Sequence, residues 1–324
     1  MKNIAVLTGG RAAEVEISRR SARTVVAHLP RDRYRPYLVE LRGQQFVEVE
    51  TEQVLDLNDF GFDGPDGRVR FAAVYGSIHG DPYENGRLQG YFELLQLSYT
   101  GAGPTAMALT FDKQSTKAAL AGQGIPMAAS VRVNKGVPID IHSITPLKFP
   151  CFVKPNANGS SYGVSRVETA SELTAAINKG FQYDDALLIE EFLAGREFTQ
   201  GVYRDAEGQV VILPITEIRT SNAFFDYNAK YQGNSEEITP ANLSPDLAAT
   251  CSAQTRRIYE YLQLRGVSRV DYILRGDQFF MLEVNTVPGM SEASVIPQQC
   301  TAAGIPLGEL LHAVLLDASG QEVE

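Results

Sequence analysis

The alternation of strands and helices in the first hundred residues constrains the fold more than any other feature. A short buried strand is indicated at residues 3–8, followed by a Gly9-Gly10 turn and a helical pattern over residues 13–29. Further strands are indicated at residues 37–41 and 71–75. This order predicts a parallel α/β sheet. Ligands bind such sheets at the carboxyl ends of the strands, so we expect a site at the loops after the first and last of these strands.

A glycine and proline cluster at residues 101–104 ends this pattern. Beyond it, apolar spacing predicts helices at residues 105–110, 112–121 and 169–179, and strands at residues 130–133, 152–154, 186–190, 197–203 and 210–215. A last long helix is expected to start at Ser244-Pro245 and to stop at Gly266. The sequence therefore predicts a mixed α/β and α+β fold in three lobes, at residues 1–103, 104–196 and 197–324.

Composition excludes several classes of protein. The 324 residues are 44% apolar and 21% charged, which excludes a disordered or fibrous chain. The net charge of -10 argues against a nucleic-acid or anionic-membrane partner. No run approaches the roughly 20 apolar residues of a membrane span, and no signal peptide is evident, so we expect a cytoplasmic protein. Three widely separated cysteines predict reduced thiols and no disulfide framework or zinc site.

A lysine precedes a small, hydroxyl-rich loop at residues 154–163, KPNANGSSYG. Glycine lets backbone N–H groups approach a ligand closely, and the hydroxyls of Ser160 and Ser161 add donors, so this loop can fold over phosphates. Because Lys154 comes before the loop and no GK[ST] closes it, the segment is not a Walker A motif. The alternative is a mobile surface loop.

Two apolar strands near the C-terminus, residues 269–274 and 279–285, are separated by a hairpin-type turn. Side chains two apart share a strand face, so Glu283 and Asn285 point the same way, and a turn centred near residue 277 would place Asp271 opposite Glu283. Burying carboxylates without a cation is costly. Mg²⁺ held by these oxygens and by substrate phosphates would explain them. The alternative is a structural ion pair between Asp271 and Arg269.

The segment over residues 188–198, LIEEFLAGREF, is an apolar strand that runs into an acidic linker. Such a linker could contact the adenine edge and the ribose of a nucleotide held between lobes. Acidic linkers are common, so this motif by itself has low specificity.

Residues 224–235, FFDYNAKYQGNS, are polar and rich in aromatic side chains and lie in a long stretch of weak periodicity. This pattern is typical of a loop that closes over an active site. The alternative is a surface loop with incidental aromatic residues.

These four elements in this order resemble an ATP-grasp ligase. Further segments narrow the resemblance to the D-alanine–D-alanine ligase family over essentially the whole chain: GGRAAEVEIS at residues 9–18, HG at 79–80, YTG at 99–101, FDK at 111–113, YNAKY at 227–231 and NTVPGM at 285–290. The resemblance implies a homodimer that phosphorylates the carboxylate of one D-alanine with ATP. The amine of a second D-alanine then attacks the acylphosphate, and the dipeptide serves peptidoglycan synthesis.

The resemblance also implies roles for residues toward ATP and metal. The phosphates would be held by Lys113 and Lys154 and covered by the loop of Ser160 and Ser161, with Lys230 on the closing loop near the γ-phosphate. Adenine and ribose would contact Glu190, Glu191, Leu193 and Glu197. Two Mg²⁺ ions, for which Mn²⁺ can substitute, would be held by Asp271, Glu283 and Asn285, with Glu283 bridging.

For the amino-acid substrates, the resemblance implies that Glu14 holds the ammonium of the first D-alanine, with His79 nearby. Arg269 and the backbone of Gly289 would stabilise the reacting carboxyl oxygens, and Ser294 would bind the carboxylate of the second D-alanine. Glu14, Ser160, Arg269 and Tyr231 are accordingly the expected catalytic residues. Taken by itself, Glu14 has an alternative as an exposed acid at a helix start.

Some positions depart from the family pattern. Phe225 stands where many relatives have tyrosine, and Asn85 stands where aspartate is commoner. Tyr231 accompanies D-alanine as the second substrate in the family, whereas phenylalanine accompanies D-lactate, so we expect the dipeptide. The rivals are a ligase of the same fold that uses D-lactate or D-serine, and a nucleotide-binding scaffold without catalysis.

Overall fold

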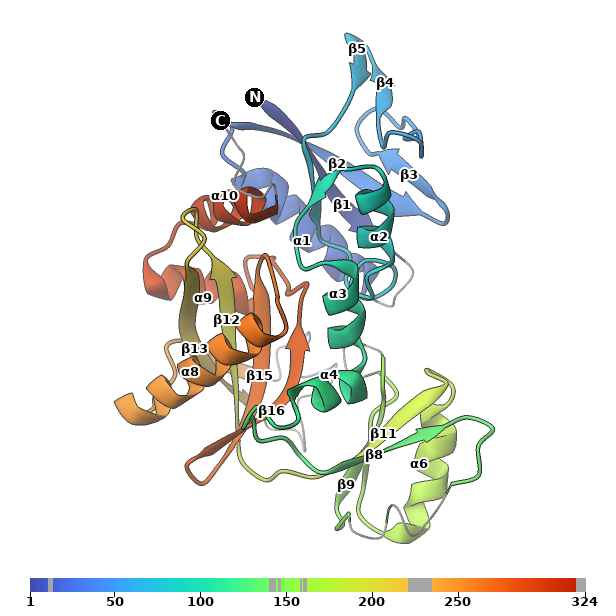
Figure 1. Ribbon diagram of the computed structural model, residues 1–324, viewed down its shortest axis with the longest axis vertical. Coiled ribbons are helices and arrows are strands. Elements are labelled where there is room, and N and C mark those ends of the chain that lie inside the picture. The colour runs from blue at the N-terminus through green and yellow to red at the C-terminus, as the bar shows by residue number, and fades with distance from the viewer. Residues whose placement is uncertain are drawn as a thin grey trace.

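The N-terminal residues form a five-stranded sheet in the order β3-β2-β1-β6-β7, in a computed structural model that describes residues 1–10, 14–139, 144, 147–157, 159, 162–220 and 235–318 (Figure 1). Its strands are β1 (Lys2–Gly9), β2 (Tyr34–Arg42), β3 (Gln45–Glu48), β6 (Ala73–Gly76) and β7 (Ser98–Tyr99). The central strand β1 pairs in parallel with β2 and β6. The predicted parallel sheet is therefore confirmed for β2, β1, β6 and β7, and β3 joins its edge antiparallel to β2.

Two helices and a small hairpin accompany this sheet: α1 (Val15–His28), α2 (Arg87–Leu94), and the pair β4 (Phe62–Gly64) and β5 (Gly67–Val69). Helix α1 follows the glycine turn after β1 and packs along β1 and β2. Because β1 and β6 are parallel, their carboxyl ends lie at one edge of the sheet, as the strand order predicts.

The central sheet has the order β10-β9-β11-β8 and is antiparallel. Its strands are β8 (Ser130–Asn134), β9 (Cys151–Pro155), β10 (Ser165–Val167) and β11 (Ala186–Glu191). A 3₁₀ turn, η1 (Ala170–Glu172), precedes α6 (Leu173–Gly180), which packs on β9 and β10. The helix thus starts four residues later than the predicted residue 169.

The C-terminal sheet has the order β14-β13-β12-β15-β16. Its strands are β12 (Arg196–Arg204), β13 (Val210–Thr220), β14 (Ser235–Ile238), β15 (Ser268–Arg275) and β16 (Gln278–Asn285). Its helices are α8 (Pro245–Tyr261), α9 (Val295–Ala303) and α10 (Leu307–Ala318). Helices α8 and α9 pack on β12 and β13, whereas α10 also contacts α1 and β6 of the N-terminal sheet (Figure 1).

Helices α3 (Pro104–Phe111) and α4 (Lys113–Leu120) connect the N-terminal sheet to the central sheet. Both pack against β16 of the C-terminal sheet, and α3 also contacts α2. The strands of the three sheets follow the three predicted ranges except that β12 starts at Arg196, one residue before the third range, and these two helices and α10 lie across the lobes. The lobe boundaries at residues 103 and 196 stay predictions.

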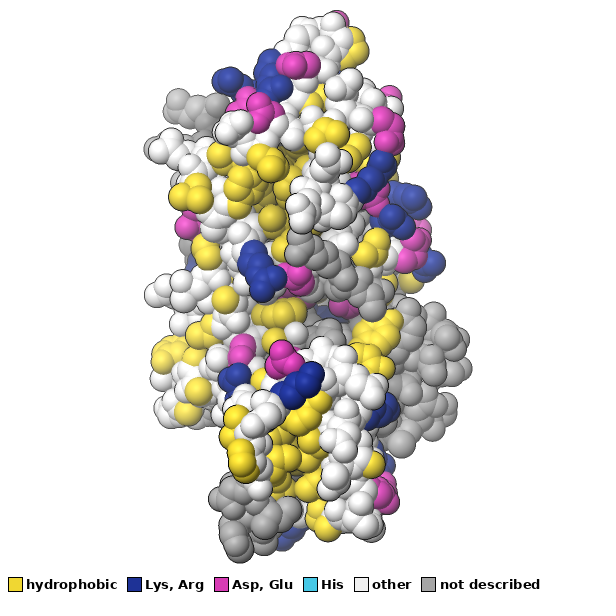
Figure 2. All heavy atoms as spheres, turned by 90° about the vertical axis from the view of Figure 1, so that its right-hand side faces the viewer, with side chains coloured by type: hydrophobic (Ala, Val, Ile, Leu, Met, Phe, Trp, Pro, Cys, Tyr) yellow, Lys and Arg dark blue, Asp and Glu magenta, His cyan; other side chains and the backbone are white. Residues whose placement is uncertain are grey.

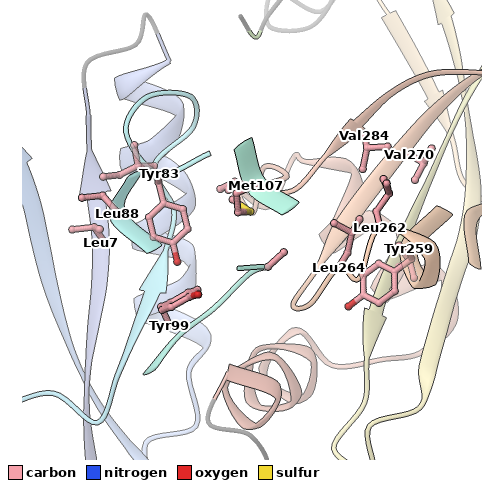
Figure 3. Packing of buried hydrophobic residues seen from close by; sticks show 14 of the residues in the cluster. Leu7, Tyr83, Leu88, Tyr99, Met107, Tyr259, Leu262, Leu264, Val270 and Val284 are labelled. Atoms are coloured by element: carbon pink, nitrogen blue, oxygen red, sulfur yellow. The ribbon is translucent and has the colours of Figure 1, made fainter. Parts of the chain in front are cut away.

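One apolar core crosses from the N-terminal sheet to the C-terminal sheet. Leu7 and Tyr83 on one side and Leu264 and Val284 on the other belong to the same buried cluster, and Met107 of α3 lies between them (Figure 3). The central sheet instead has a separate core that includes Val153. The two outer sheets therefore share their buried apolar surface.

Helix α8 begins as predicted, because the Ser244 side chain accepts a hydrogen bond from the N–H of Leu247 and Pro245 opens the first turn. The predicted stop at Gly266 is wrong, since the helix ends at Tyr261. Gln263 has a positive φ of 52°, and the N–H of Leu264 bonds back to the carbonyl of Tyr259. This is a Schellman closure in which glutamine takes the position that glycine usually fills.

Charges on the surface are mixed. Basic and acidic side chains are interspersed on the face drawn in Figure 2, and no patch of one sign dominates it.

The three cysteines are free and buried. Within the described ranges, no single helix is both long and apolar enough to cross a membrane; the bent pair α9 and α10, at 109° to each other, reaches that length and composition only when taken together.

Candidate active site

The β15–β16 hairpin gathers the predicted metal ligands on one face. Arg269 pairs with Asn285 and Asp271 pairs with Glu283 in the antiparallel register. The turn lies between Arg275 and Gln278, so the predicted placement of Asp271 opposite Glu283 is confirmed. A register shift follows directly after Asp271 and leaves these two pairs in line.

The Asp271 carboxylate is almost fully buried and accepts hydrogen bonds from three side chains. Arg269 binds both of its oxygens, with Nε at 2.9 Å and Nη2 at 2.8 Å, and the amide nitrogen of Asn285 lies 3.0 Å away. The hydroxyl of Thr199 on the neighbouring strand β12 donates at 2.5 Å. The ion pair with Arg269 is therefore real, and Asp271 is held in one orientation.

Thr199 did not emerge from the sequence. It lies 72 residues from Asp271, and only the pairing of β12 with β15 places the two opposite each other. No local spacing or motif marks such a contact.

The donor set suits Mg²⁺ better than a metal that needs many protein ligands. Among the described residues, no group of three or more His, Cys, Asp or Glu side chains is arranged to hold a metal. The hairpin offers two carboxylates and one amide, and the Glu283 Oε2 lies 3.5 Å from the Lys113 Nζ of α4. Mg²⁺ commonly binds one or two carboxylates and completes its shell with phosphate oxygens and water. An ion here would therefore need the nucleotide as a co-ligand.

Glu14 and His79 lie together at the carboxyl edge of the N-terminal sheet. Glu14 directly precedes α1 and is buried, so the alternative of an exposed helix-start acid is wrong. His79 is buried in the loop after β6, and its Nε2 lies 3.4 Å from the Ser21 hydroxyl of α1. Burial lowers the pKa of His79, although the nearby Glu14 opposes this effect. Burial thus disfavours the charged form of His79.

The loop after β9 reaches across to Glu14. A Cβ added to Gly159 would lie 2.7 Å from the Glu14 Oε2, so a larger residue would displace this carboxylate. Backbone that follows the central sheet's β9 thereby lies beside Glu14, the residue predicted to bind the first amino acid. This contact agrees with a loop that covers the site.

Glu84 is a second acid near Glu14 and Glu283, and the sequence did not single it out. The N–H of Gly80 donates to its carboxylate at 2.9 Å. Burial raises the pKa of Glu84 to about 7, and the charges of Glu14 and Glu283 add to this effect while Lys113 opposes it. Glu84 therefore stands between the predicted amino-acid and metal residues.

The cations of the central sheet converge on Glu190 of β11. Lys154 of β9 binds the Glu190 Oε1 at 2.5 Å, and Lys117 of α4 binds Oε2 at 2.7 Å. Burial would raise the pKa of Glu190, but the two lysines outweigh it and lower that pKa. Lys117 did not emerge from the sequence, although its position four residues after Lys113 on a predicted helix could have indicated a shared face.

The start of α4 is fully capped by protein groups. Asn156, directly after β9, accepts from the N–H of Lys113 with its carbonyl and from the N–H of Gln114 with its side chain, both at 3.0 Å. The Asp112 side chain accepts from the N–H of Ser115 at 2.7 Å. Asn156 also donates to Asp112 at 2.6 Å, so β9 and α4 are held in a fixed relation.

The residues predicted to contact adenine and ribose lie at the junction of the central and C-terminal sheets. Leu193 is buried in a small cluster with Ala128 and Phe280. Glu191 points away from Glu190, as neighbours on a strand do, and accepts a hydrogen bond from Arg275 at 3.1 Å. Glu197 is on β12, opposite Ile273. The structure thus brings these residues to one junction, but Glu190 alone joins the lysine cluster.

Gly289 and Ser294 lie next to each other after β16. A Cβ at Gly289 would lie 2.8 Å from the Ser294 Oγ, and that hydroxyl also bonds the Ser291 hydroxyl at 2.7 Å. The Met290 N–H donates to Ser21 of α1, which ties this loop to the N-terminal sheet. Ser160, Ser161, Lys230, Tyr231 and most of the predicted closing loop lie outside the described residues.

Three sheets, with two lysines on Glu190 of the central sheet and Lys113 of the connecting helix α4 beside Glu283 of a C-terminal hairpin, are the arrangement of an ATP-grasp enzyme. Solved structures agree: a D-alanyl-alanine synthetase A from Vibrio cholerae has a TM-score of 0.88 and 26% identity, covering 98% of each chain. The VanG D-Ala:D-Ser ligase from Enterococcus faecalis has a TM-score of 0.86 and 26% identity, over 97% of this chain and 98% of that one. A D-alanine–D-alanine ligase from Bacillus anthracis complexed with ATP has a TM-score of 0.81 and 25% identity, over 99% and 98%.

The particular family follows from sequence comparison. Residues 3–102 match the model of the D-ala D-ala ligase N-terminus, and residues 122–316 match that of the D-ala D-ala ligase C-terminus. D-alanine–D-alanine ligases from Phocaeicola vulgatus and Flavobacterium johnsoniae are each 40% identical to the chain. These alignments cover 97% of this chain and 98% of the relative for the first, and 96% and 97% for the second. The chain belongs to the D-alanine–D-alanine ligase family.

Proposed function

We propose that this chain joins two D-alanine molecules to D-alanyl-D-alanine, with ATP phosphorylating the first carboxylate, and that the dipeptide serves peptidoglycan synthesis. The observation that carries this proposal is the proximity of three groups at one seam between the N-terminal and C-terminal sheets, since Glu14 and Arg269 both act on His79, and Glu14 and Lys113 both act on Glu84. Glu14 is buried, Arg269 lies beside the hairpin carboxylates, and Lys113 of α4 reaches Glu283. Such a seam can hold an ammonium, a carboxylate and a phosphate close together.

Glu14 is proposed to bind the ammonium of the first D-alanine. Burial of His79 beside it disfavours the charged imidazolium, which would repel that ammonium. Arg269 and the Gly289 backbone would stabilise the carboxyl oxygens as they become phosphorylated, because an anion that attacks an anion needs preorganised positive charge. The loop of Ser160 and Ser161 and the loop of Lys230 are proposed to exclude water, which would hydrolyse an acylphosphate.

Lys113 and Lys154 are proposed to hold the phosphates of ATP, and Glu190, Glu191, Leu193 and Glu197 its adenine and ribose. Asp271, Glu283 and Asn285 would hold two Mg²⁺ ions. When bound, the ions would neutralise charge on the transferred phosphoryl group. Thr199 and Arg269 would keep Asp271 in place for this role.

The second substrate distinguishes the proposal from its nearest rival. Ser294 is proposed to bind the carboxylate of the second D-alanine, and Tyr231 to favour an amine over a hydroxyl as the nucleophile. The likeness to a D-Ala:D-Ser ligase of 26% identity keeps D-serine in the test. Phosphate release with D-alanine alone, and then with D-lactate or D-serine added across pH, identifies the substrate. Preference for D-lactate at neutral pH would overturn the choice of D-alanine.

Isothermal titration tests the second rival, a nucleotide-binding scaffold without catalysis. ATP binding with no D-alanine-dependent turnover would favour that class, whereas turnover excludes it.

We also propose a homodimer in the cytoplasm, by analogy with the family, and light scattering on the purified chain measures its mass. A monomer at working concentrations would contradict the dimer.

A further inference from the structure

Lys117, the buried lysine of α4, has none of the roles proposed so far. Lys117 makes two short contacts: its Nζ lies 2.7 Å from the Glu190 Oε2 and 2.6 Å from the carbonyl of Ala128. It is only 9% exposed, and burial lowers its pKa, although Glu190 opposes this. Lys117 is therefore fixed in place by an anion and a backbone dipole.

Lys154 is held differently at the same carboxylate. It binds the other Glu190 oxygen at 2.5 Å and comes from β9, directly before the phosphate loop. When Lys154 turns toward a nucleotide phosphate, Glu190 loses one of its two positively charged partners. Because Glu190 is only 4% exposed, solvent does not replace that partner.

We propose that Lys117 is a positioning residue for nucleotide binding: it stays on Glu190 and neutralises it, so that Lys154 can leave Glu190 for a phosphate. This inference rests on the proposed assignment of Lys154 to the phosphates. Without Lys117, Lys154 would be the remaining lysine on a buried carboxylate, and phosphate and Glu190 would compete for it. Removing the charge of Glu190 would end the competition.

The test is a double-mutant cycle over Lys117→Met and Glu190→Gln. ADP binding is measured by isothermal titration, and KM for ATP and kcat by coupled ADP release. We expect Lys117→Met to weaken ADP binding and raise KM for ATP about ten-fold in the wild-type background, and less than about two-fold in the Glu190→Gln background. We expect kcat and the KM for D-alanine to change little. Equal weakening in both backgrounds, or a loss of kcat at unchanged KM, would overturn the inference.

Lys135→Met is the matched control, because this lysine of the same lobe is exposed and pairs with exposed Asp185. Thermal unfolding checks each variant, and Lys117→Gln, which keeps a donor for Ala128 without the charge, replaces the methionine variant if that protein does not fold. ADP binding needs no D-alanine, so the cycle reports on Lys117 even if the amino-acid substrate is wrong. Normal ADP binding by Lys154→Met would contradict the assignment on which the inference rests.

Discussion

The central sheet and the two outer sheets bury apolar surface in different ways. The outer sheets share one core, in which Leu7 of β1 and Val270 of β15 belong to the same cluster. The central sheet packs Leu187 and Val153 against its own helix α6. It meets the C-terminal sheet through smaller features: the Glu191–Arg275 ion pair, the cluster at Leu193, and a short bridge between Met127 and Met281.

This difference indicates which parts of the site are fixed to each other. Glu14, Arg269 and Asp271 stand on the joined outer sheets, whereas Lys154 and Glu190 stand on the central sheet. Contacts that are small and polar cost less to rearrange than a continuous apolar core. We therefore expect Glu14, Arg269 and Asp271 to form one rigid group, to which the central sheet is attached less firmly, in part through α4, which packs on β16 and is hydrogen-bonded to Asn156.

Glu283→Gln separates activity from stability most clearly. The side chain is on a strand of the joined core but is proposed to bind the metal, so we expect kcat to fall about 10³-fold or more with little change in unfolding temperature. Phosphate release and thermal unfolding measure the two effects, with the exposed Glu260→Gln as control. Near-normal turnover would contradict the metal assignment.

Leucine truncations test whether the two cores are separate. Leu264→Ala in the shared core and Leu187→Ala in the central core should each cost about 2–5 kcal/mol, because both side chains are fully buried. Hydrogen exchange should show loss of protection in both outer sheets for Leu264→Ala, and in the central sheet for Leu187→Ala. Loss of protection across all three sheets in either variant would break the comparison.

Gly159→Ala tests the contact of the central loop with the amino-acid site. The added methyl group must displace the Glu14 carboxylate, so we expect kcat/KM for D-alanine to fall about 10- to 100-fold. ADP binding should stay unchanged. Gly90→Ala is the control, since a Cβ there meets nothing within 4 Å. An unchanged KM for D-alanine would argue against the role of Glu14.

Glu84→Gln tests the charge of the seam. A carboxyl group whose pKa is raised from 4.5 to about 7 binds its proton more tightly in the folded protein, so the stability it contributes is lost as pH rises through that range. Metal-free protein should show this decline in denaturant unfolding, and the variant should lack that part of it. The exposed Glu207→Gln should behave as wild type; a decline equal in all three would refute the prediction.

Arg275→Ala should have the smallest effect. It removes the ion pair with Glu191 at the junction, a partly exposed contact expected to contribute less than about 1 kcal/mol. Denaturant unfolding and the KM for ATP measure it. A large stability loss across the outer sheets would show that the central sheet is attached more firmly than its contacts suggest.

The sequence predicted those parts of the site that local pattern determines. The short turn between Arg275 and Gln278 fixes the register of the hairpin, so the pairing of Asp271 with Glu283 could be read before the fold was known. The parallel N-terminal sheet followed in the same way from its alternation of strands and helices.

The missed residues depend on contacts between distant segments. Thr199 meets Asp271 only because β12 pairs with β15, and the pKa of Glu84 is raised in part by Glu14 and Glu283, which are distant from each other in the sequence. The predicted end of α8 was wrong for another reason. Gln263 adopts a positive-φ conformation that glycine usually takes, and the residue type does not reveal this.

The capped start of α4 has a consequence for how the enzyme treats phosphate. Many nucleotide-binding proteins bind phosphate with the free backbone N–H groups at a helix N-terminus, and no side-chain substitution removes these groups. Here Asn156 and Asp112 already occupy those amides. At this helix, phosphate would have to be bound by side chains such as Lys113, so single substitutions there could change nucleotide affinity without rebuilding the backbone.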